Sequence, residues 1–330
     1  MATLFPNLTN APGNNPISQS QIPPNPNLPN APQNQTPPNP NSPNPPQNQT
    51  PPNPNSPNPP QNQTPPTPPT PPAPPANSIN TTSGNDNITG DASDNFILGG
   101  TGSDTLSGGE STDTVSYLSL NSGITLQAKG IVDKGAAGSD ILNSIEHITA
   151  PLGQINTIDA STGSGVASIN VDLSTNSLAV NNLPGIGTLN FTVDNFVNVV
   201  GTPNVDVITG NRQDNNLIGG GGNDTLSGLR GNDILIGVDR SSATPGSDET
   251  DVLIGGQGRD TFVLGDVTNT YYKGAGVALI QDFQQGRDLI QLHGKLSDYS
   301  IVGNSINLAG TSDQIAVIQG NFTTDSFVFV

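Results

Sequence analysis

Aspartates recur at steps of nine residues in two parts of the sequence, and each follows a glycine-rich stretch. Residues 219–227 read GGGGNDTLS, and neighbouring stretches keep the same order of residue types. Carboxylate and turn carbonyl oxygens brought together in this way suit a hard divalent cation, and calcium takes roughly 6–8 such ligands. A glycine-rich loop can also cradle phosphates, but no Gly-Lys-Ser or Gly-Lys-Thr follows this one, which excludes a P-loop.

The nine-residue step holds for eleven nonapeptides, four over 81–116 and seven over 201–263, with an isolated copy at 135–143. The first four positions favour glycine and small polar residues, which suit a tight turn. The eighth position is Ile, Leu, Val or Phe in every copy except 237–245. Each unit is therefore predicted to form a polar turn and then a three-residue strand with one inward apolar side chain.

The sixth position carries the carboxylate in most copies, and Asp140 occupies it in the isolated copy. Two copies have Asn95 or Asn215 there instead, each directly after an aspartate. The predicted metal ligands combine the sixth positions of the two blocks with those two preceding aspartates. They are Asp86, Asp94, Asn95, Asp104, Asp113, Asp206, Asp214, Asn215, Asp224, Asp233, Asp251 and Asp260.

A single unit buries one side chain and cannot fold alone, whereas stacked units bury a continuous row. Two nonapeptides per coil give an 18-residue turn in which every second repeat stacks on the last. Carboxylates stacked at a strand spacing repel one another in a partly desolvated site, and a divalent cation removes that repulsion. The predicted stacked pairs are Asp86 with Asp104, Asn95 with Asp113, Asp206 with Asp224, Asn215 with Asp233, and Asp233 with Asp251.

The nonapeptide 237–245 departs from the pattern, because Ser242 occupies its sixth position and Thr244 its eighth. We expect it to break the stack and to leave the sites of Asp224 and Asp260 weak or empty. Acidic residues nearby either compensate for this loss or are simply solvated: Asp239, Asp248 and Glu249.

The repeated motif resembles the consensus GGxGxDxUx of the RTX family, whose bacterial members bind calcium in a parallel β-roll. The match is closest at 99–107, 219–227 and 255–263. The resemblance implies an all-β chain in which the nonapeptides form a right-handed parallel β-roll, a type of β-solenoid. It also implies that Ca²⁺ is the cofactor, held by sixth-position aspartates and by turn carbonyls that successive coils share.

Residues 1–77 differ from the rest of the chain in composition. They hold 28 of the 32 prolines, and the 14-residue segment PQNQTPPNPNSPNP begins at Pro32 and repeats unchanged from Pro46. An uncharged tract with so little apolar content cannot offset its chain entropy. We therefore expect a disordered Pro/Asn-rich linker over 1–77.

The remaining chain divides where the nine-residue step begins and ends. Between the two blocks, 123–127, 167–174 and 189–193 alternate apolar and polar residues as half-buried strands do. After the second block, short apolar strands are expected to pack as an antiparallel cap, since an open solenoid edge would recruit another chain. The predicted parts are a first calcium-binding block over 78–116, a β-solenoid connecting segment over 117–200, a second calcium-binding block over 201–263 and a C-terminal β-cap over 264–330.

Charge and hydropathy restrict the partners and the location. The net charge of −18 falls on 86–330, which argues against nucleic acid and anionic membranes as partners. No transmembrane segment is expected, and the N-terminus lacks the basic and apolar regions of a signal peptide. Residues 255–294 look like the C-terminal segment of RTX proteins, cyanobacterial ones especially, in which this part directs type I secretion. The resemblance therefore implies an ABC exporter as partner and a secreted, extracellular or cell-surface protein.

The sequence contains no recognisable catalytic constellation. It has neither HExxH nor GxSxG, and its two histidines, His147 and His293, have no metal-spaced or triad-like partners. The excess of aspartate is accounted for by the calcium frame. We expect a structural or adhesive protein, not an enzyme, with cell-surface polysaccharide or another cell as its partner. The alternative is a calcium-dependent hydrolase or lyase that acts on extracellular polysaccharide.

Overall fold

The computed structural model describes residues 73–76, 78–183, 185 and 187–330. Within these residues the strands form two sheets, here called sheet A and sheet B, of 14 and 12 strands. In spatial order sheet A contains β1 (Ile79–Asn80), β3 (Phe96–Leu98), β5 (Thr114–Ser116), β9 (His147–Thr149), β13 (Gly187–Asp194), β12 (Ser177–Leu183), β11 (Ser168–Asp172), β15 (Val207–Thr209), β17 (Thr225–Ser227), β19 (Thr250–Ile254), β21 (Val277–Gln281), β25 (Gln314–Ile318), β24 (Ser305–Leu308) and β23 (Tyr299–Val302).

Sheet B runs alongside sheet A. In spatial order it contains β2 (Asn87–Thr89), β4 (Thr105–Ser107), β8 (Ser139–Asn143), β7 (Ile131–Asp133), β6 (Thr125–Gln127), β10 (Thr157–Asp159), β14 (Asn198–Val200), β16 (Asn216–Gly220), β18 (Ile234–Val238), β20 (Thr261–Val263), β22 (Leu289–Leu292) and β26 (Phe327–Phe329). Single 3-10 turns occur at η1 (Ala128–Gly130), η2 (Gly135–Ala137), η3 (Leu296–Asp298) and η4 (Thr324–Ser326).

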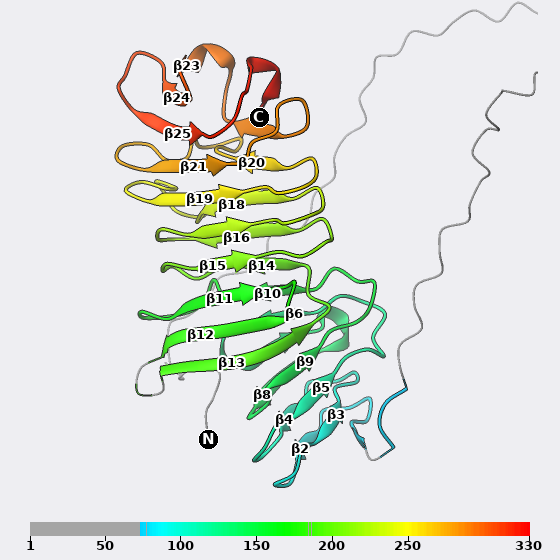
Figure 1. Ribbon diagram of the computed structural model, residues 1–330. Helices are drawn as coiled ribbons and strands as arrows, with labels where there is room; N and C mark the ends of the chain where they lie inside the picture. Colours follow the sequence, from blue (N-terminus) through cyan, green and yellow to red (C-terminus); the bar gives the residue numbers. More distant parts are fainter. Residues whose placement is uncertain (1–72, 77, 184, 186) are drawn as a thin grey trace, which may run out of the picture. The chain divides into compact units, whose positions relative to one another are not determined.

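Except for 237–245, each nonapeptide contributes a turn and one short strand, and these nonapeptides supply the two sheets in alternation. In the second block β15, β17 and β19 pair in parallel within sheet A, while β16, β18 and β20 pair in parallel within sheet B. The resulting ladder of arrows is visible in Figure 1. The prediction of an all-β chain with parallel nonapeptide coils is confirmed.

In every nonapeptide except 237–245, the eighth position carries an apolar residue that packs in or against the core between the two sheets. Its side chain points inward because residues of a strand alternate between the two faces of a sheet. Ten of these apolar residues are at most 1% exposed: Ile97, Leu106, Val115, Leu142, Ile208, Leu217, Leu226, Leu235, Leu253 and Phe262.

The connecting segment continues both sheets but adds antiparallel strands to each. The strands expected at 123–127, 167–174 and 189–193 are present as β6, β11 and β13. In sheet B, β7 is antiparallel to both β6 and β8, and in sheet A, β12 is antiparallel to both β11 and β13. These excursions fall where the nine-residue step is absent from the sequence.

The register predicted for the second block is wrong at one point. β18 pairs with β20 and β17 pairs with β19, so these partners lie 27 residues apart in sequence rather than 18. Asp233 therefore stacks on Asp260, not on Asp251. The extra nine residues loop out between β18 and β19, because 237–245 lacks the apolar residue that would fill its place in the core.

The prediction that the C-terminal strands form an antiparallel cap is only partly correct. β21 and β25 extend the parallel order of sheet A, and β22 and β26 extend that of sheet B. Among the C-terminal strands, β24 is antiparallel to both β23 and β25. The solenoid thus continues by two coils beyond the last nonapeptide. Almost all of the predicted linker over 1–77 lies outside the described residues.

Replacement of a core residue of the eighth position tests this architecture. Leu226→Ala leaves a cavity beneath β17, and we expect it to lower the free energy of unfolding by about 2–5 kcal/mol. Val207→Ala is the matched control on neighbouring β15, because Val207 is 43% exposed. Denaturant unfolding in excess calcium measures both variants. Equal effects of the two substitutions would contradict the burial pattern.

Candidate calcium sites

The sixth-position side chains form a ladder of hydrogen bonds along the turns, which we call the inner ladder. In each rung, one side-chain oxygen accepts the backbone N–H of the sixth-position residue one coil earlier, at 2.7–3.1 Å. The ladder consists of four runs: Asp86–Asp104–Asp140, Asn95–Asp113–Glu146, Asp206–Asp224–Asp251 and Asn215–Asp233–Asp260–Asp288.

The first residue of each run has local partners for its remaining side-chain atoms. The carboxylates of Asp86 and Asp206 accept hydrogen bonds from a threonine of their own turn. The other two runs begin with the neutral amides of Asn95 and Asn215, which bond within their turns.

The last carboxylate of three runs is also satisfied by a protein donor. Tyrosine hydroxyls donate to Oδ2 of Asp140 and of Asp251, at 2.9 and 2.7 Å. A backbone N–H donates to Oδ2 of Asp288 at 2.7 Å. These three ends of the runs therefore need no further ligand.

The interior carboxylates differ from these ends. Among the described residues, Oδ2 of Asp113, Asp224, Asp233 and Asp260 is buried and has no hydrogen-bond partner. A buried, ionised oxygen without a partner costs several kcal/mol, on the order of the penalties for unpaired buried charge. A bound cation removes this cost, so these four oxygens mark where a metal fits. A fifth interior carboxylate, that of Asp104, lies 3.5 Å from the Lys134 ammonium.

The glycines at the first position of each repeat show which oxygens face these places. A Cβ added at Gly219 would collide with Oδ2 of Asp224 and with the carbonyl oxygen of Gly237, one coil further along. Gly228 meets the corresponding oxygens of its own turn and of the next coil. Carboxylate and carbonyl oxygens of successive coils thus face one small space, as calcium requires.

Side chains alone do not complete a coordination shell. In the part of the chain that the structure describes, no three His, Cys, Asp or Glu side chains gather around one point. Turn carbonyls must supply the other ligands, in agreement with the glycine-rich sequence. The residues present fit calcium, which would neutralise adjacent coils and join them through shared oxygens.

Burial raises the pKa of several inner-ladder carboxyls. Desolvation brings the pKa of Asp224 to about 9, and the charges of Asp251, Asp206 and Glu249 contribute. The same cause brings the pKa of Asp233 to about 7. It also raises the pKa of Asp206, Asp251 and Asp260 to about 6. Asp224 is thus the carboxylate that most needs a neighbouring cation to stay ionised.

Two of the predicted ligands lie outside the inner ladder. Asp94 and Asp214 occupy the fifth position, where side chains point to solvent, and both are exposed. Each accepts the backbone N–H of the fifth-position residue one coil later, at 3.1 and 2.7 Å. Asn85, Asn223 and Asn232 do the same. These residues form an outer ladder that holds the turns in register.

Four acidic residues of the turns were not among the predicted ligands. Asp140, Glu146 and Asp288 each end a run of the inner ladder. Only Asp140 could have been recognised, since it has the sixth position of the isolated nonapeptide. The fourth, Glu249, accepts the Gly222 N–H at 3.2 Å through Oε1, while its Oε2 is buried without a hydrogen-bond partner.

The predicted break of the stack at 237–245 is wrong. Asp224 donates its backbone N–H to Asp251 at 2.8 Å, and Asp260 donates its own to Asp288 at 3.1 Å. Both carboxylates therefore have a neighbouring coil above them. Of the nearby acidic residues, Asp239 and Asp248 are exposed, whereas Glu249 joins the turn beside Asp224.

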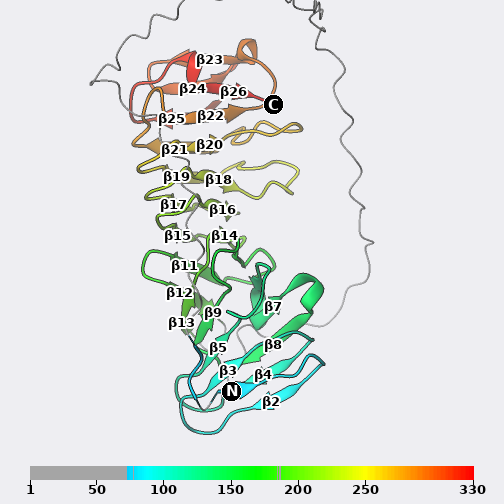
Figure 2. The same cartoon turned by 90° about the vertical axis from the view of Figure 1, so that its right-hand side faces the viewer.

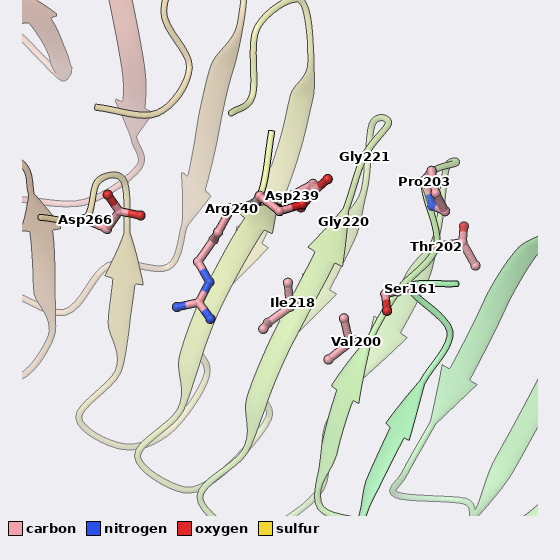
Figure 3. Close-up of a pocket in the computed structure, with 12 residues that line it drawn as sticks. Ser161, Val200, Thr202, Pro203, Ile218, Gly220, Gly221, Asp239, Arg240 and Asp266 are labelled. Carbon is pink, nitrogen blue, oxygen red and sulfur yellow. Dashed lines mark hydrogen bonds between the residues drawn. The ribbon is translucent and has the colours of Figure 1, made fainter. Parts of the chain in front are cut away.

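A groove of about 600 Å³ lies over sheet B beside the looped-out segment (Figure 3). Val200 and Ile218 from neighbouring strands line it, together with Asp239, Arg240 and Asp266. The Asp266 carboxylate accepts hydrogen bonds from three residues of its own loop, which lower its pKa to about 2. This carboxylate is therefore ionised at neutral pH and is fixed by its neighbours.

Comparisons with known proteins agree with the repeat geometry. A family model described as the RTX calcium-binding nonapeptide repeat (4 copies) matches residues 77–115, 200–235 and 245–271. The chain therefore carries RTX calcium-binding repeats, and the gap between the second and third matches falls in the looped-out segment. No match supports the narrower resemblance of the C-terminal segment to cyanobacterial members.

Among solved structures, the extracellular lipase LipA from Serratia marcescens is similar to 76% of this chain at 15% sequence identity, with a TM-score of 0.25. The chain spans 39% of the length of that lipase. No curated protein sequence matches the chain.

Removal of one inner-ladder charge tests the assignment of the sites. Asp224→Asn keeps the oxygen that accepts the Asp206 N–H but removes the unpaired charge, so one calcium ion should be lost. We expect the calcium concentration at half-saturation to rise at least about tenfold, which corresponds to about 1.4 kcal/mol. Isothermal titration calorimetry measures this change. Asp214→Asn in the outer ladder is the charge-matched control, and equal losses in both variants would contradict the assignment.

The raised pKa values predict two opposite effects of low pH. Without calcium, low pH favours folding, whereas with calcium it weakens metal binding. A carboxyl whose pKa is higher in the folded state than its usual 3.8 favours folding at low pH, and this stability is lost as the pH rises through the folded pKa. In excess chelator we therefore expect the β-sheet circular dichroism signal to grow as the pH falls from about 9 to about 5. Calcium affinity should fall over the same range, because protons compete for the carboxylates. A chelated protein whose signal ignores pH would refute this expectation.

Proposed function

We propose that this chain, whose RTX repeats bind calcium, is a secreted or cell-surface protein whose β-roll folds when it meets extracellular calcium. The single observation that carries this proposal is the set of unpaired buried oxygens of Asp113, Asp224, Asp233 and Asp260. Without a cation, folding would bury these charges or force the carboxyls to take up protons. With calcium bound, the free energy of metal binding contributes directly to folding.

The coupling between calcium and folding suits export as an unfolded chain. In a calcium-poor cytosol the acidic turns repel one another and the chain stays loose, which allows passage through a narrow type I ABC exporter. Outside the cell, calcium at ~1 mM matches the weak affinities of extracellular sites, with Kd on the order of 10⁻⁴–10⁻³ M. Among the described residues, no helix has the length and apolar character needed to cross a bilayer.

We assign the folded roll a structural or adhesive role on cell-surface polysaccharide or on another cell. The groove over sheet B supports a binding role, because Val200, Ile218 and Arg240 offer apolar and polar contacts to a ligand. The alternative role is a calcium-dependent hydrolase or lyase of extracellular polysaccharide.

Two measurements on the calcium-loaded full-length protein separate these roles. A structural or adhesive protein should be retained on immobilised cell-surface polysaccharide and leave the polymer length unchanged. A hydrolase or lyase should shorten the polymer, as seen by size-exclusion chromatography, and its activity would overturn the non-catalytic proposal.

Calcium removal tests the coupling itself. In excess chelator at pH ~8 we expect most of the β-sheet circular dichroism signal to disappear, because folding would then bury carboxylates without counter-charges or force them to take up protons. Added calcium should restore the signal, whereas magnesium should not, because it prefers a stricter octahedral shell and keeps its water. A full β-sheet signal in chelator would sink this proposal.

A further inference from the structure

Lys134 is a fully buried lysine in the inner ladder. Its Nζ lies 2.5 Å from Oδ1 of Asp140 and 3.5 Å from Oδ2 of Asp104, and it donates to the Gly99 carbonyl at 3.1 Å. The side chains of the lysine and of both aspartates have no exposed surface. The ring of Tyr117 lies on one side, with its centroid 5.7 Å from Nζ.

The atoms around this ammonium are of the same kinds as those around the unpaired oxygens of the other runs. Asp104 is an interior carboxylate, Asp140 is the carboxylate one coil later, and Gly99 occupies the first position of the Asp104 nonapeptide. Of the five interior aspartates of the ladder with an unbonded Oδ2, the other four have no ion pair in the described part of the chain.

The fold explains how the lysine reaches this place. β7 is antiparallel to β8, and Lys134 follows the last residue of β7 in the short turn that joins the two strands (Figure 2). β8 in turn pairs in parallel with β4, the strand that follows Asp104. The antiparallel excursion of sheet B thus delivers a positive charge to the last coil interface of the first block.

We propose that the Lys134 ammonium is a built-in replacement for calcium between Asp104 and Asp140. The interface between the first block and the connecting segment then carries its own cation, and this rung takes no metal. Calcium is required only where the sequence supplies no such group. The inference builds on the calcium sites proposed above. From the nonapeptide pattern alone, the place between Asp104 and Asp140 would count as one of these calcium sites.

The first test counts bound calcium by native mass spectrometry. Lys134→Met keeps a long apolar side chain but removes the charge, so a calcium ion should enter the vacated place. The variant is expected to bind one more ion than the wild-type protein. Lys273→Met, which removes the charge of an exposed lysine, is the matched control and should bind the wild-type number. An unchanged count in a folded Lys134→Met protein overturns the proposal.

A second variant covers the case in which Lys134→Met does not fold even with calcium. Lys134→Met combined with Asp104→Asn removes one charge of each sign, keeps the oxygen that accepts the Asp86 N–H, and leaves Asp140 with its own protein donors. This double variant should fold and bind the wild-type number of ions. Failure of both variants to fold would show that the charge of Lys134 is not its role, and would overturn the proposal.

The two proposals fail in different ways. A wild-type protein without bound calcium contradicts the proposed function alone. The assignment of Lys134 is then judged by denaturant unfolding in chelator, where the double variant should regain the stability that Lys134→Met loses. No recovery in the double variant would refute the assignment.

Discussion

The structure depends on the need to neutralise carboxylates that the stacking of coils buries one strand spacing apart, at about 4.8 Å. Beyond the first coil, each sixth-position aspartate bonds to the backbone of the previous coil through one oxygen, and this bond sets the register of the turns. The same bond turns the second oxygen into the interior. Each aspartate that stabilises a turn in this way therefore has a second, buried oxygen that needs a positive charge or a hydrogen-bond donor beside it.

The chain meets this demand in three ways. At the start of a run, a threonine of the same turn or a neutral asparagine removes the problem. At the end of a run, the hydroxyl of Tyr117 or Tyr272 donates to the free oxygen, and in one rung the Lys134 ammonium adds a full positive charge. The remaining interior carboxylates, those of Asp113, Asp224, Asp233 and Asp260, need an external cation. Calcium dependence is thus concentrated in particular coil interfaces rather than spread evenly along the roll.

The sequence was sufficient to predict the parallel coils, because one property repeats at each position. An apolar residue at the eighth position must enter the core, and an aspartate at the sixth must lie in the turn. It was not sufficient to predict the register across 237–245. A nonapeptide of correct length can fill a coil or loop out, and the local signs were Ser242 at the sixth position and Thr244, which cannot replace a core leucine, at the eighth.

The positions of the other acidic residues depend on the direction in which their side chains point, not on the residue type alone. Asp94 and Asp214 directly precede an inner-ladder amide, but neighbouring residues of an extended chain point to opposite sides, so both face solvent. Glu146 and Asp288 belong to the inner ladder, but they lie just before strands that are outside the nine-residue repeats. Lys134 belongs to no motif, and its role depends on an antiparallel hairpin whose pairing only the three-dimensional structure reveals.

The most direct measurement of the central claim is a crystal structure of the calcium-loaded protein with anomalous scattering to locate the ions. The account predicts calcium beside Oδ2 of Asp113, Asp224, Asp233 and Asp260, with the Lys134 ammonium and no ion between Asp104 and Asp140. Ions bound only at the exposed outer-ladder residues, or no ions beside these four oxygens, would contradict it.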